Sequence, residues 1–249
     1  MRIVSLCPSL TELVFDLGRG PDLVGRTKFC VHPPDGVADV ESVGGTKNPK
    51  VARIVALQPD LVLLNAEENR REDAEALQAA GVRCHVSMPR DAGETAAMVR
   101  SIGAALERPA EAEAIARDIE ARAARVRAAA RGRPPVRYAY LIWREPYMTV
   151  SDDTFVAALL ALPGGENVFG AHAERYPTIT PEALAAADPA LVLLSSEPFP
   201  FRAKHADELA ARTGLPRERF RLVDGELLSW HGSRTPAGID YAERVVRGE

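Results

Sequence analysis

The sequence predicts an α/β protein with two similar lobes, each built on a mostly parallel sheet, joined by one long rigid helix. Short apolar runs alternate with helical patterns along the chain, an apolar motif occurs twice, and an Ala-, Glu- and Arg-rich segment separates the two copies. Alternating strands and helices with short connections are typical of parallel α/β sheets. A chain of 249 residues is long enough for two lobes of ordinary size.

The N-terminal part of the chain supplies the elements of the first lobe. Apolar runs bounded by glycine, proline or polar residues predict strands at Ile3–Leu6, Leu23–Gly25, Leu61–Leu64 and Val82–Val86. Helical patterns predict three helices, two of which stop at a glycine. These are a helix opened by Thr11 and Glu12 that stops at Gly18, one from Pro49 through Leu57, and one over Arg71–Ala80.

The second lobe is predicted from an internal repeat. The run V-A-L-Q-P-D-L-V-L-L-N at 55–65 returns as A-A-A-D-P-A-L-V-L-L-S at 185–195. Each copy reads as a helix end, a proline and a buried strand, and two copies of one unit imply two similar lobes. Further strands are expected at Arg137–Ile142 and Phe220–Val223, and Asp152 and Asp153 are interpreted as the N-terminal cap of a helix.

The segment between the copies is predicted to be a stiff helix. It begins at Pro109, and Gly132, Pro134 and Pro135 follow its end, which is the expected helix punctuation. Its interior is Ala, Glu and Arg, and at 1.5 Å per residue it would be roughly 34 Å long. The predicted boundaries are therefore 1–107 for the first lobe, 108–132 for the helix and 133–249 for the second lobe.

Composition excludes several classes of function. Hydrophobic residues make up 46% and charged residues 27% of the chain, and the net charge is -4. No basic block is present, so neither nucleic acid nor an anionic membrane is an expected partner. Cys7, Cys30 and Cys84 are widely spaced without a CxxC motif, which suggests neither a disulfide framework nor a thiolate zinc site. The start M-R-I-V-S-L-C-P-S lacks signal-peptide features, which predicts a cytoplasmic chain as it stands and a periplasmic or cell-surface one if a leader precedes it.

An enzyme is not expected. The sequence has no G-x-S-x-G elbow, no H-E-x-x-H, no Walker loop and no G-x-G-x-x-G after a strand. Ser9, near Glu12, is interpreted as part of a helix start. Cys30 and His32 as a thiolate dyad would need a third, orienting group. We therefore predict no catalytic residue and no cofactor of the protein's own.

Polar and aromatic segments follow the predicted strands, where ligands approach α/β lobes. The four segments are Lys28–His32, Gly44–Asn48, Trp143–Met148 and Ser229–Arg234. Aromatic rings beside guanidinium groups suit a large, flat, partly anionic ligand, although both tryptophans could instead be core anchors. The predicted ligand contacts are Lys28, Phe29, Cys30, His32, Thr46, Lys47, Trp143, Arg144, Tyr147, Tyr176, Trp230, His231 and Arg234.

A bare metal site is a weaker alternative. Cys30 and His32 are two residues apart, which places their side chains on the same side of an extended segment. A transition metal needs a third and usually a fourth ligand, and His231 is the most obvious further donor. We prefer these two residues as part of a pocket wall and assign no metal ligand.

Nearly the whole chain resembles the helical-backbone (class III) periplasmic substrate-binding proteins for vitamin B12, ferric siderophores and haem. The resemblance rests on the opening I-V-S-L-C-P-S-L-T-E-L, on V-G-G-T-K-N-P-K-V-A-R-I-V-A-L-Q-P-D-L-V, on P-G-G-E-N-V-F at 163–169 and on Y-P-T-I-T-P-E-A-L at 176–184. It implies a corrinoid or iron-chelate ligand, itself carrying cobalt or iron, bound in a cleft between two lobes. Phe29 falls where B12 binders place an aromatic residue, whereas Thr46 and Tyr176 fall where they place tryptophans.

The resemblance also implies an ABC importer permease as partner. Family members that deliver to importers carry one exposed acidic residue on each lobe, and Glu182 matches this position in the second lobe. Ala52, flanked by Lys50 and Arg53, stands at the first-lobe position, where a methyl group cannot make the charge-assisted contact. A cytoplasmic corrinoid- or chelate-handling protein without an importer is therefore the second alternative. We expect a monomer.

Overall fold

The computed structural model describes residues 1–248. Contacts between Cα atoms divide the chain into two compact units. Unit 1 comprises Met1–Pro89, Glu94–Arg117 and the short segment His231–Arg234, and unit 2 comprises Arg90–Gly93, Asp118–Trp230 and the chain from Thr235 onward. This division falls inside the long helix, whereas the boundaries expected from sequence follow the helix ends. Within the described residues, no helix combines the length and apolar character needed to cross a bilayer.

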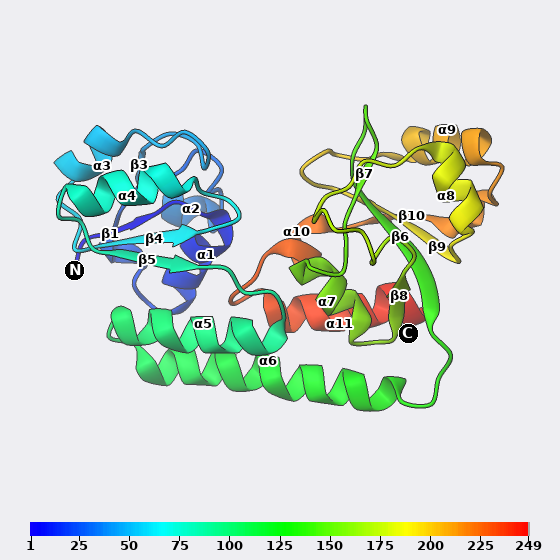
Figure 1. Ribbon diagram of the computed structural model, residues 1–249. Helices are drawn as coiled ribbons and strands as arrows, with labels where there is room; N and C mark the ends of the chain where they lie inside the picture. Colours follow the sequence, from blue (N-terminus) through cyan, green and yellow to red (C-terminus); the bar gives the residue numbers. More distant parts are fainter. Residues whose placement is uncertain (249) are drawn as a thin grey trace. The chain divides into compact units, whose positions relative to one another are not determined.

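Unit 1 is built on a five-stranded parallel sheet with the order β3-β2-β1-β4-β5 (Figure 1). The strands are β1 (Ile3–Ser5), β2 (Leu23–Arg26), β3 (Glu41–Ser42), β4 (Leu61–Asn65) and β5 (Cys84–Ser87). The central strands β1 and β4 are buried throughout, as expected when helices cover both faces of a parallel sheet. Strand order reverses between β1 and β4, a position where ligands commonly bind in this type of sheet.

The helices of unit 1 pack their apolar positions against this sheet. They are α1 (Pro8–Asp16), η1 (Gly20–Asp22), α2 (Pro34–Val37), α3 (Val51–Ala56), α4 (Arg71–Ala79) and most of α5 (Ala92–Ala105). Ile54 of α3 and Leu77 of α4 share one buried cluster with Val62 and Leu64 of β4. Helix α1 begins at Pro8, earlier than predicted, because proline at the first helical position needs no hydrogen-bond acceptor for its nitrogen.

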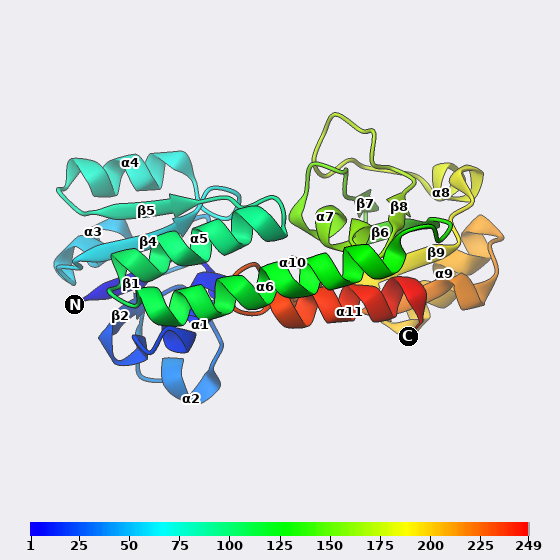
Figure 2. The same cartoon turned by 90° about the horizontal axis from the view of Figure 1, so that it is seen from below.

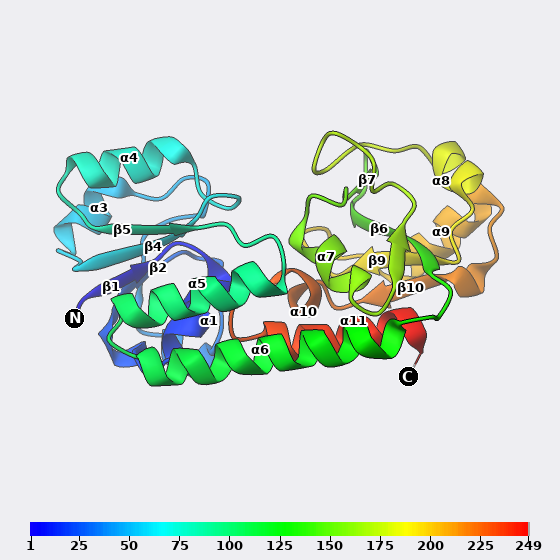
Figure 3. The same cartoon turned by 60° about the horizontal axis from the view of Figure 1, so that its bottom comes forward.

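Unit 2 contains a second five-stranded sheet, with the order β10-β9-β6-β7 and β8 paired with β6 (Figure 3). Its strands are β6 (Val136–Trp143), β7 (Met148–Thr149), β8 (Gly165–Asn167), β9 (Leu191–Ser195) and β10 (Phe220–Val223). All pairings are parallel except that of β6 with β7. The predicted mixed α/β fold with two mostly parallel sheets is thus confirmed.

Both faces of the unit 2 sheet are covered. Ala139 and Leu141 of β6 lie in one buried cluster, while Tyr138 and Tyr140 lie in another on the opposite face, as the two-residue period of a strand requires. The surrounding helices are α7 (Phe155–Ala161), α8 (Pro181–Ala187), α9 (Ala203–Thr213), η2 (Arg217–Arg219), α10 (Gly225–Ser229) and α11 (Thr235–Arg247). The cap of α7 is Thr154, so the interpretation of Asp152 and Asp153 as the cap was wrong.

The long helix α6 (Pro109–Ala130) has a narrow buried stripe of small and aliphatic residues. The stripe recurs every three or four positions and consists of Ala112, Ala116, Ile119, Ala123 and Val126. In unit 1, α5 and α6 lie side by side (Figure 2), and a Cβ added at Gly103 of α5 would lie 2.1 Å from the Cβ of Ala112. In unit 2, Arg125 of α6 bonds Asp240 and Glu243 of α11 at 2.7 and 2.8 Å.

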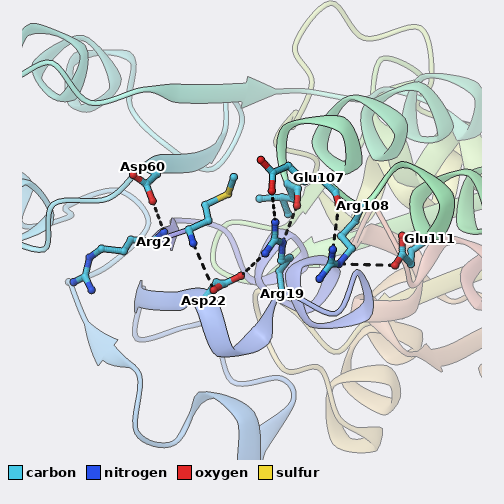
Figure 4. A network of polar contacts seen from close by, with 9 residues as sticks. Arg2, Arg19, Asp22, Asp60, Glu107, Arg108 and Glu111 are labelled. Carbon is cyan, nitrogen blue, oxygen red and sulfur yellow. Dashed lines mark hydrogen bonds and ion pairs between the residues drawn. The ribbon is translucent and has the colours of Figure 1, made fainter.

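Arg19 fastens the turn between α5 and α6 to the rest of unit 1 (Figure 4). Its Nε donates to the carbonyl of Leu106 at 2.7 Å, and its terminal nitrogens lie 2.9 Å from Asp22 and from Glu107. The contacts with Leu106 and Glu107 join the loop before β2 to the turn that precedes the long helix. The turn directly before Pro109, where the long helix was predicted to begin, is therefore held in place by Arg19.

Candidate ligand-binding loops

His231 lies at the point in unit 1 where strand order reverses. Its Nε2 is 2.8 Å from Nδ2 of Asn65, the last residue of β4, and its Nδ1 is 3.4 Å from Oγ of Ser9 in α1. The side chain is buried, and burial lowers the pKa of His231 to about 4. His231 is therefore neutral at physiological pH. Its position indicates that it forms part of the frame beneath the loops, whereas its contact with a ligand stays a prediction.

The loop after β2 presents one aromatic residue to solvent and buries its cysteine. Phe29 is 51% exposed, and Nζ of Lys28 lies 4.9 Å from its ring centroid. Cys30 is fully buried, with Sγ 3.1 Å from Oγ1 of Thr27, and burial raises the pKa of its thiol. The amide of Cys30 donates to the carbonyl of Thr27 at 3.1 Å, so this stretch is a turn. The turn ends at Cys30, so the expectation that Cys30 and His32 lie on the same side of an extended segment stays a prediction.

Two asparagines that the sequence interpretation missed hold the neighbouring loops of unit 1. Nδ2 of Asn69 donates to the carbonyls of Leu6 at 2.9 Å and Thr46 at 3.0 Å. Oδ1 of Asn65 accepts from the amide of Glu67 at 2.9 Å. Both asparagines are buried, and the signal available in the sequence was the polar run N-A-E-E-N directly after a buried strand.

The loop Gly44–Asn48 is fixed to this frame. Gly44 has a φ of 113°, and a Cβ there would lie 2.8 Å from the carbonyl oxygen of Asn48, which restricts the position to glycine. Thr46 is buried, and the exposed Lys47 donates to the backbone carbonyl of Glu67. Of the two predicted contacts here, only Lys47 is on the surface.

In unit 2, the end of β6 carries an exposed tryptophan on an aromatic support. Trp143 is 40% exposed, and its ring meets Phe199 edge to face with 5.9 Å between centroids. Phe199 in turn lies 4.9 Å from Phe201 and 5.2 Å from His205. The sequence interpretation missed Phe199, although E-P-F-P-F directly follows the buried strand β9.

Arg144, next to Trp143, is paired within unit 2. Its Nη2 lies 2.7 and 2.8 Å from the two carboxylate oxygens of Glu208 on α9, and its Nη1 lies 3.0 Å from Glu145. These acceptors raise the pKa of Arg144. Tyr147 is buried in the core cluster around Phe169, so its ring supports the β6–β7 connection from inside.

The remaining predicted contacts differ in accessibility. Tyr176 and Trp230 are half-buried, and Tyr176 packs against the cluster of Tyr138 and Tyr140. Arg234 belongs to unit 1, where its Nε lies 2.6 Å from Glu12 of α1. The proposed docking residue Glu182 is exposed in the first turn of α8.

The geometry gives no support to a bare metal site. Within residues 1–248, no three His, Cys, Asp or Glu side chains come together in a way that could hold a metal ion. Cys30 bonds Thr27, and His231 bonds Asn65 and Ser9. The convergence of Cys30, His32 and His231 that the alternative required is absent from this part of the chain.

Each unit also has a pocket that none of the predicted residues lines. The pocket in unit 2 has a volume of about 450 Å³ at the carboxyl ends of β9 and β10. It is lined by Leu194, Ser196, Phe201, Leu222, Val223, Asp224 and Glu226. The pocket in unit 1 has a volume of about 360 Å³ between α4 and the sheet, and Asn65, Asn69 and Arg70 contribute to it.

Comparisons with known proteins agree with this architecture. The vitamin B12-binding protein of Vibrio parahaemolyticus is 27% identical over 194 residues, which cover 78% of this chain and 70% of that protein. A periplasmic heme binding protein from Pseudomonas aeruginosa has a TM-score of 0.84 at 26% identity, covering 100% of this chain and 93% of its own. The periplasmic vitamin B12 binding protein of Vibrio cholerae has the same fold, with a TM-score of 0.84 at 20% identity over 98% of this chain and 95% of its own.

The family profile described as periplasmic binding protein matches residues 3–217. This range spans most of both units and includes the motifs on which the resemblance was based. The chain belongs to the periplasmic binding protein family.

Proposed function

We propose that this protein is a monomeric solute-binding protein that binds a large metal chelate of the corrinoid or iron-chelate class without changing it chemically. The metal would arrive as part of the ligand. The observation that carries the proposal is the placement of exposed aromatic side chains. Phe29 and Trp143 are exposed, whereas the other aromatic residues, all within the described part of the chain, are buried or half-buried.

Phe29 lies in the loop after β2 and Trp143 is the last residue of β6, so each exposed ring lies at the carboxyl end of a strand in its own unit. Aromatic surface gains free energy when it leaves water, so each ring offers a favourable apolar contact to a ligand. Flat macrocycles provide the complementary surface. The similarity to vitamin B12-binding and heme binding proteins supports the same ligand class.

The proposed setting is delivery to an ABC importer on the outer side of the cytoplasmic membrane. The two solved relatives are described as periplasmic. Glu182 is exposed in the first turn of α8 and would serve docking from unit 2. In unit 1, Ala52 is exposed on α3, and neighbouring Arg53 already bonds Glu41 at 2.8 Å. Docking would therefore depend mainly on unit 2.

Equilibrium dialysis with cyanocobalamin, hemin and a ferric hydroxamate, read by visible absorbance, tests the proposal. We expect saturable binding of at least one chelate and recovery of that chelate unchanged. Phe29→Ala and Trp143→Ala should each weaken binding by about tenfold, the effect of about 1.4 kcal/mol of lost contact. Leu222→Ala is the control, because Leu222 is 49% exposed on β10 and lines the pocket at the ends of β9 and β10, which none of the predicted contacts lines.

Absence of binding to all three chelates would overturn the proposal. An equal loss in Leu222→Ala would instead point to the pocket at β9 and β10 as the ligand site. Binding of zinc alone, reduced in Cys30→Ser and His32→Ala, would restore the bare-metal alternative.

A further inference from the structure

The pocket at the carboxyl ends of β9 and β10 is built from unit 2 alone. Its volume of about 450 Å³ lies within the range of roughly 300–1,000 Å³ that is usual for small-molecule sites. None of the residues predicted to contact the chelate lines this pocket. It therefore offers a second binding site, separate from the loops on which the proposed function rests.

Backbone contacts hold the two loops that form the pocket close together. The amide of Ser196 donates to the carbonyl of Val223 at 3.0 Å, and the amide of Gly225 donates to Oγ of Ser196 at 2.8 Å. A Cβ added at Gly225 would lie 2.4 Å from Oγ of Ser195, so this close approach of the two loops restricts the position to glycine. The walls of the pocket are thus formed without a ligand.

The floor of the pocket is apolar. Leu194 and Phe201 belong to the buried core of unit 2, and both line the pocket together with Leu222, which is 49% exposed. An apolar group of a ligand that covers Leu222 would remove this surface from water, which is favourable. The aromatic ring of Phe201 can also attract a cation.

The charged lining of the pocket is negative. This lining, all of it within the described residues, includes Asp224 and Glu226 but no lysine, arginine or histidine. A third carboxylate, that of Glu197, lies at the same end of the sheet, where it accepts from Oγ of Ser229 at 2.7 Å. Burial raises the pKa of Tyr140, and the charges of Glu197 and Asp224 raise it further, as expected beside concentrated negative charge.

The neighbouring basic residues leave this charge only partly compensated. Arg221 precedes Leu222 on β10 and so points to the opposite face of the sheet, where it donates to the carbonyl of Val245 at 3.2 Å. Arg202 and Lys204 at the start of α9 are exposed, and their two charges are fewer than those of the three carboxylates. The pocket therefore favours a positively charged ligand.

An inorganic cation does not suit this pocket. Within residues 1–248, no three His, Cys, Asp or Glu side chains come together in a way that could hold a metal ion. A metal ion would also leave the apolar floor exposed to water. The combination of two carboxylates with an apolar floor instead matches a molecule that is cationic at one end and apolar at the other.

We propose that this pocket binds a small organic ammonium ion with an apolar body. The ammonium group meets Asp224 and Glu226, and the apolar body lies on Leu222 and Phe201. The carboxylates select against neutral and anionic molecules of the same shape. This inference goes beyond the proposed function and does not depend on it, because a different set of residues is involved.

Three phenyl compounds of similar size test the charge selectivity. Phenethylamine is a cation at pH 7, 2-phenylethanol is neutral and phenylacetate is an anion. In a ligand-observed NMR titration with the full chain, we expect phenethylamine to bind at least about tenfold more tightly than 2-phenylethanol, and phenylacetate to bind more weakly still. Equal binding of phenethylamine and 2-phenylethanol would overturn the inference.

Two competitors test the nature of the cation. Neither calcium nor N-acetyl-lysine methylamide, a mimic of a lysine in a partner protein, should bind as tightly as phenethylamine. Displacement of phenethylamine by an equal concentration of calcium would assign the pocket to an inorganic cation and overturn the inference. Tighter binding of the lysine mimic would overturn the small-molecule ligand in favour of a partner protein.

Single substitutions that remove one carboxylate locate the site. Asp224→Asn and Glu226→Gln should each weaken phenethylamine binding by at least about threefold, with little change for 2-phenylethanol. Asparagine can still accept from the amide of Leu227, as Asp224 does at 3.1 Å, and so keeps the cap of α10.

Glu218→Gln is the matched control for these two variants. It changes the net charge equally, but Glu218 is exposed in η2, which precedes β10 at the opposite end of that strand. Phenethylamine binding should change by less than about 1.5-fold in this variant. Equal losses in all three variants, at unchanged melting temperatures, would show that the net charge of the protein and not this pocket attracts the cation.

Discussion

His231 accepts a hydrogen bond from Asn65 across 2.8 Å between Nε2 and Nδ2, and this contact fixes the state of the imidazole. The orientation of the amide follows from its oxygen, because Oδ1 of Asn65 accepts from the amides of Glu67 and Glu68 at 2.9 and 3.1 Å. Nδ2 therefore faces the ring and can only donate. The proton of the neutral ring must lie on Nδ1, from which it is directed to Ser9 at 3.4 Å.

This arrangement predicts a pH-dependent stability that depends on His231. Burial lowers the pKa of His231 from the ordinary 6.5 to about 4, so the unfolded chain takes up a proton at this residue before the folded chain does. The stability that neutral His231 contributes is fully present above about pH 6.5 and is lost as the pH falls toward 4. Wild-type protein should lose about 3 kcal/mol more than His231→Gln between pH 7 and pH 4, measured by urea denaturation.

The matched control is His172→Gln, because His172 is exposed. This variant should follow the wild-type pH profile. Parallel profiles of wild type and His231→Gln would contradict the buried neutral state.

The His231→Gln protein is expected to be less stable than wild type at pH 7 by about 2 kcal/mol, because Asn65 and Ser9 lose their partner.

The ion pair between Arg234 and Glu12 holds the C-terminal end of the short segment His231–Arg234 in unit 1. Their side chains are 19% and 20% exposed, whereas those of Arg71 and Glu75 on α4 are 87% and 56% exposed. A double-mutant cycle of Glu12→Gln with Arg234→Gln should give a coupling of about 1 kcal/mol that largely survives 1 M salt.

The pair of Arg71 and Glu75 is the reference for this cycle. An exposed pair one helical turn apart should couple by about 0.3 kcal/mol or less, and salt should remove it. Equal coupling of both pairs in urea denaturation would show that the 231–234 segment is not held more firmly than an ordinary surface contact.

The sheets could be predicted from sequence more fully than the loops. Buried strands such as β4 and β9 are local apolar runs that end at polar residues, so their positions follow from short stretches of chain. The partners of the site residues are not local. His231 is 222 residues from Ser9 and 166 from Asn65, and Arg144 is 64 from Glu208. The assembled fold determines which residues meet across such sequence separations. The loops could therefore be predicted from the sequence, but the hydrogen-bond and ion-pair partners of their side chains could not.

The cap of α7 shows the same limit on a smaller scale and gives a third prediction. D-D-T offers three possible caps in succession, and the structure selects Thr154, whose Oγ1 lies 3.4 Å from the amide of Ala157 and donates to the carbonyl of Ser151 at 2.8 Å. The burial of Phe155 and Val156 determines where the first turn begins. Thr154→Ala should cost about 1 kcal/mol or more in thermal or urea unfolding.

Asp153→Ala is the matched control for the cap. Asp153 is exposed and lies 3.2 Å from Arg175, so its loss should cost less than about 0.5 kcal/mol. A larger loss of unfolding free energy in Asp153→Ala than in Thr154→Ala would show that Asp153, and not Thr154, caps α7.

The three cysteines should differ in reactivity. Cys7 and Cys30 are buried, and burial raises the pKa of Cys7 to about 12 and that of Cys30 above its ordinary value. Partial burial also raises the pKa of Cys84, so what distinguishes this thiol is its accessibility on the edge strand β5. Because the thiolate is the reactive form and must also be reached by the reagent, an aromatic disulfide reagent at pH 8 should modify one thiol per native chain, and all three in denaturant.

Cys84→Ser identifies the reactive thiol. This variant should show no rapid phase in the native state and two thiols after unfolding. A remaining rapid phase would mean that Cys7 or Cys30 becomes accessible in the folded protein. If the reactive thiol were that of Cys30, which lies directly beside Phe29, the loop after β2 would open readily, and the exposed ring could then no longer be treated as a fixed surface for a ligand.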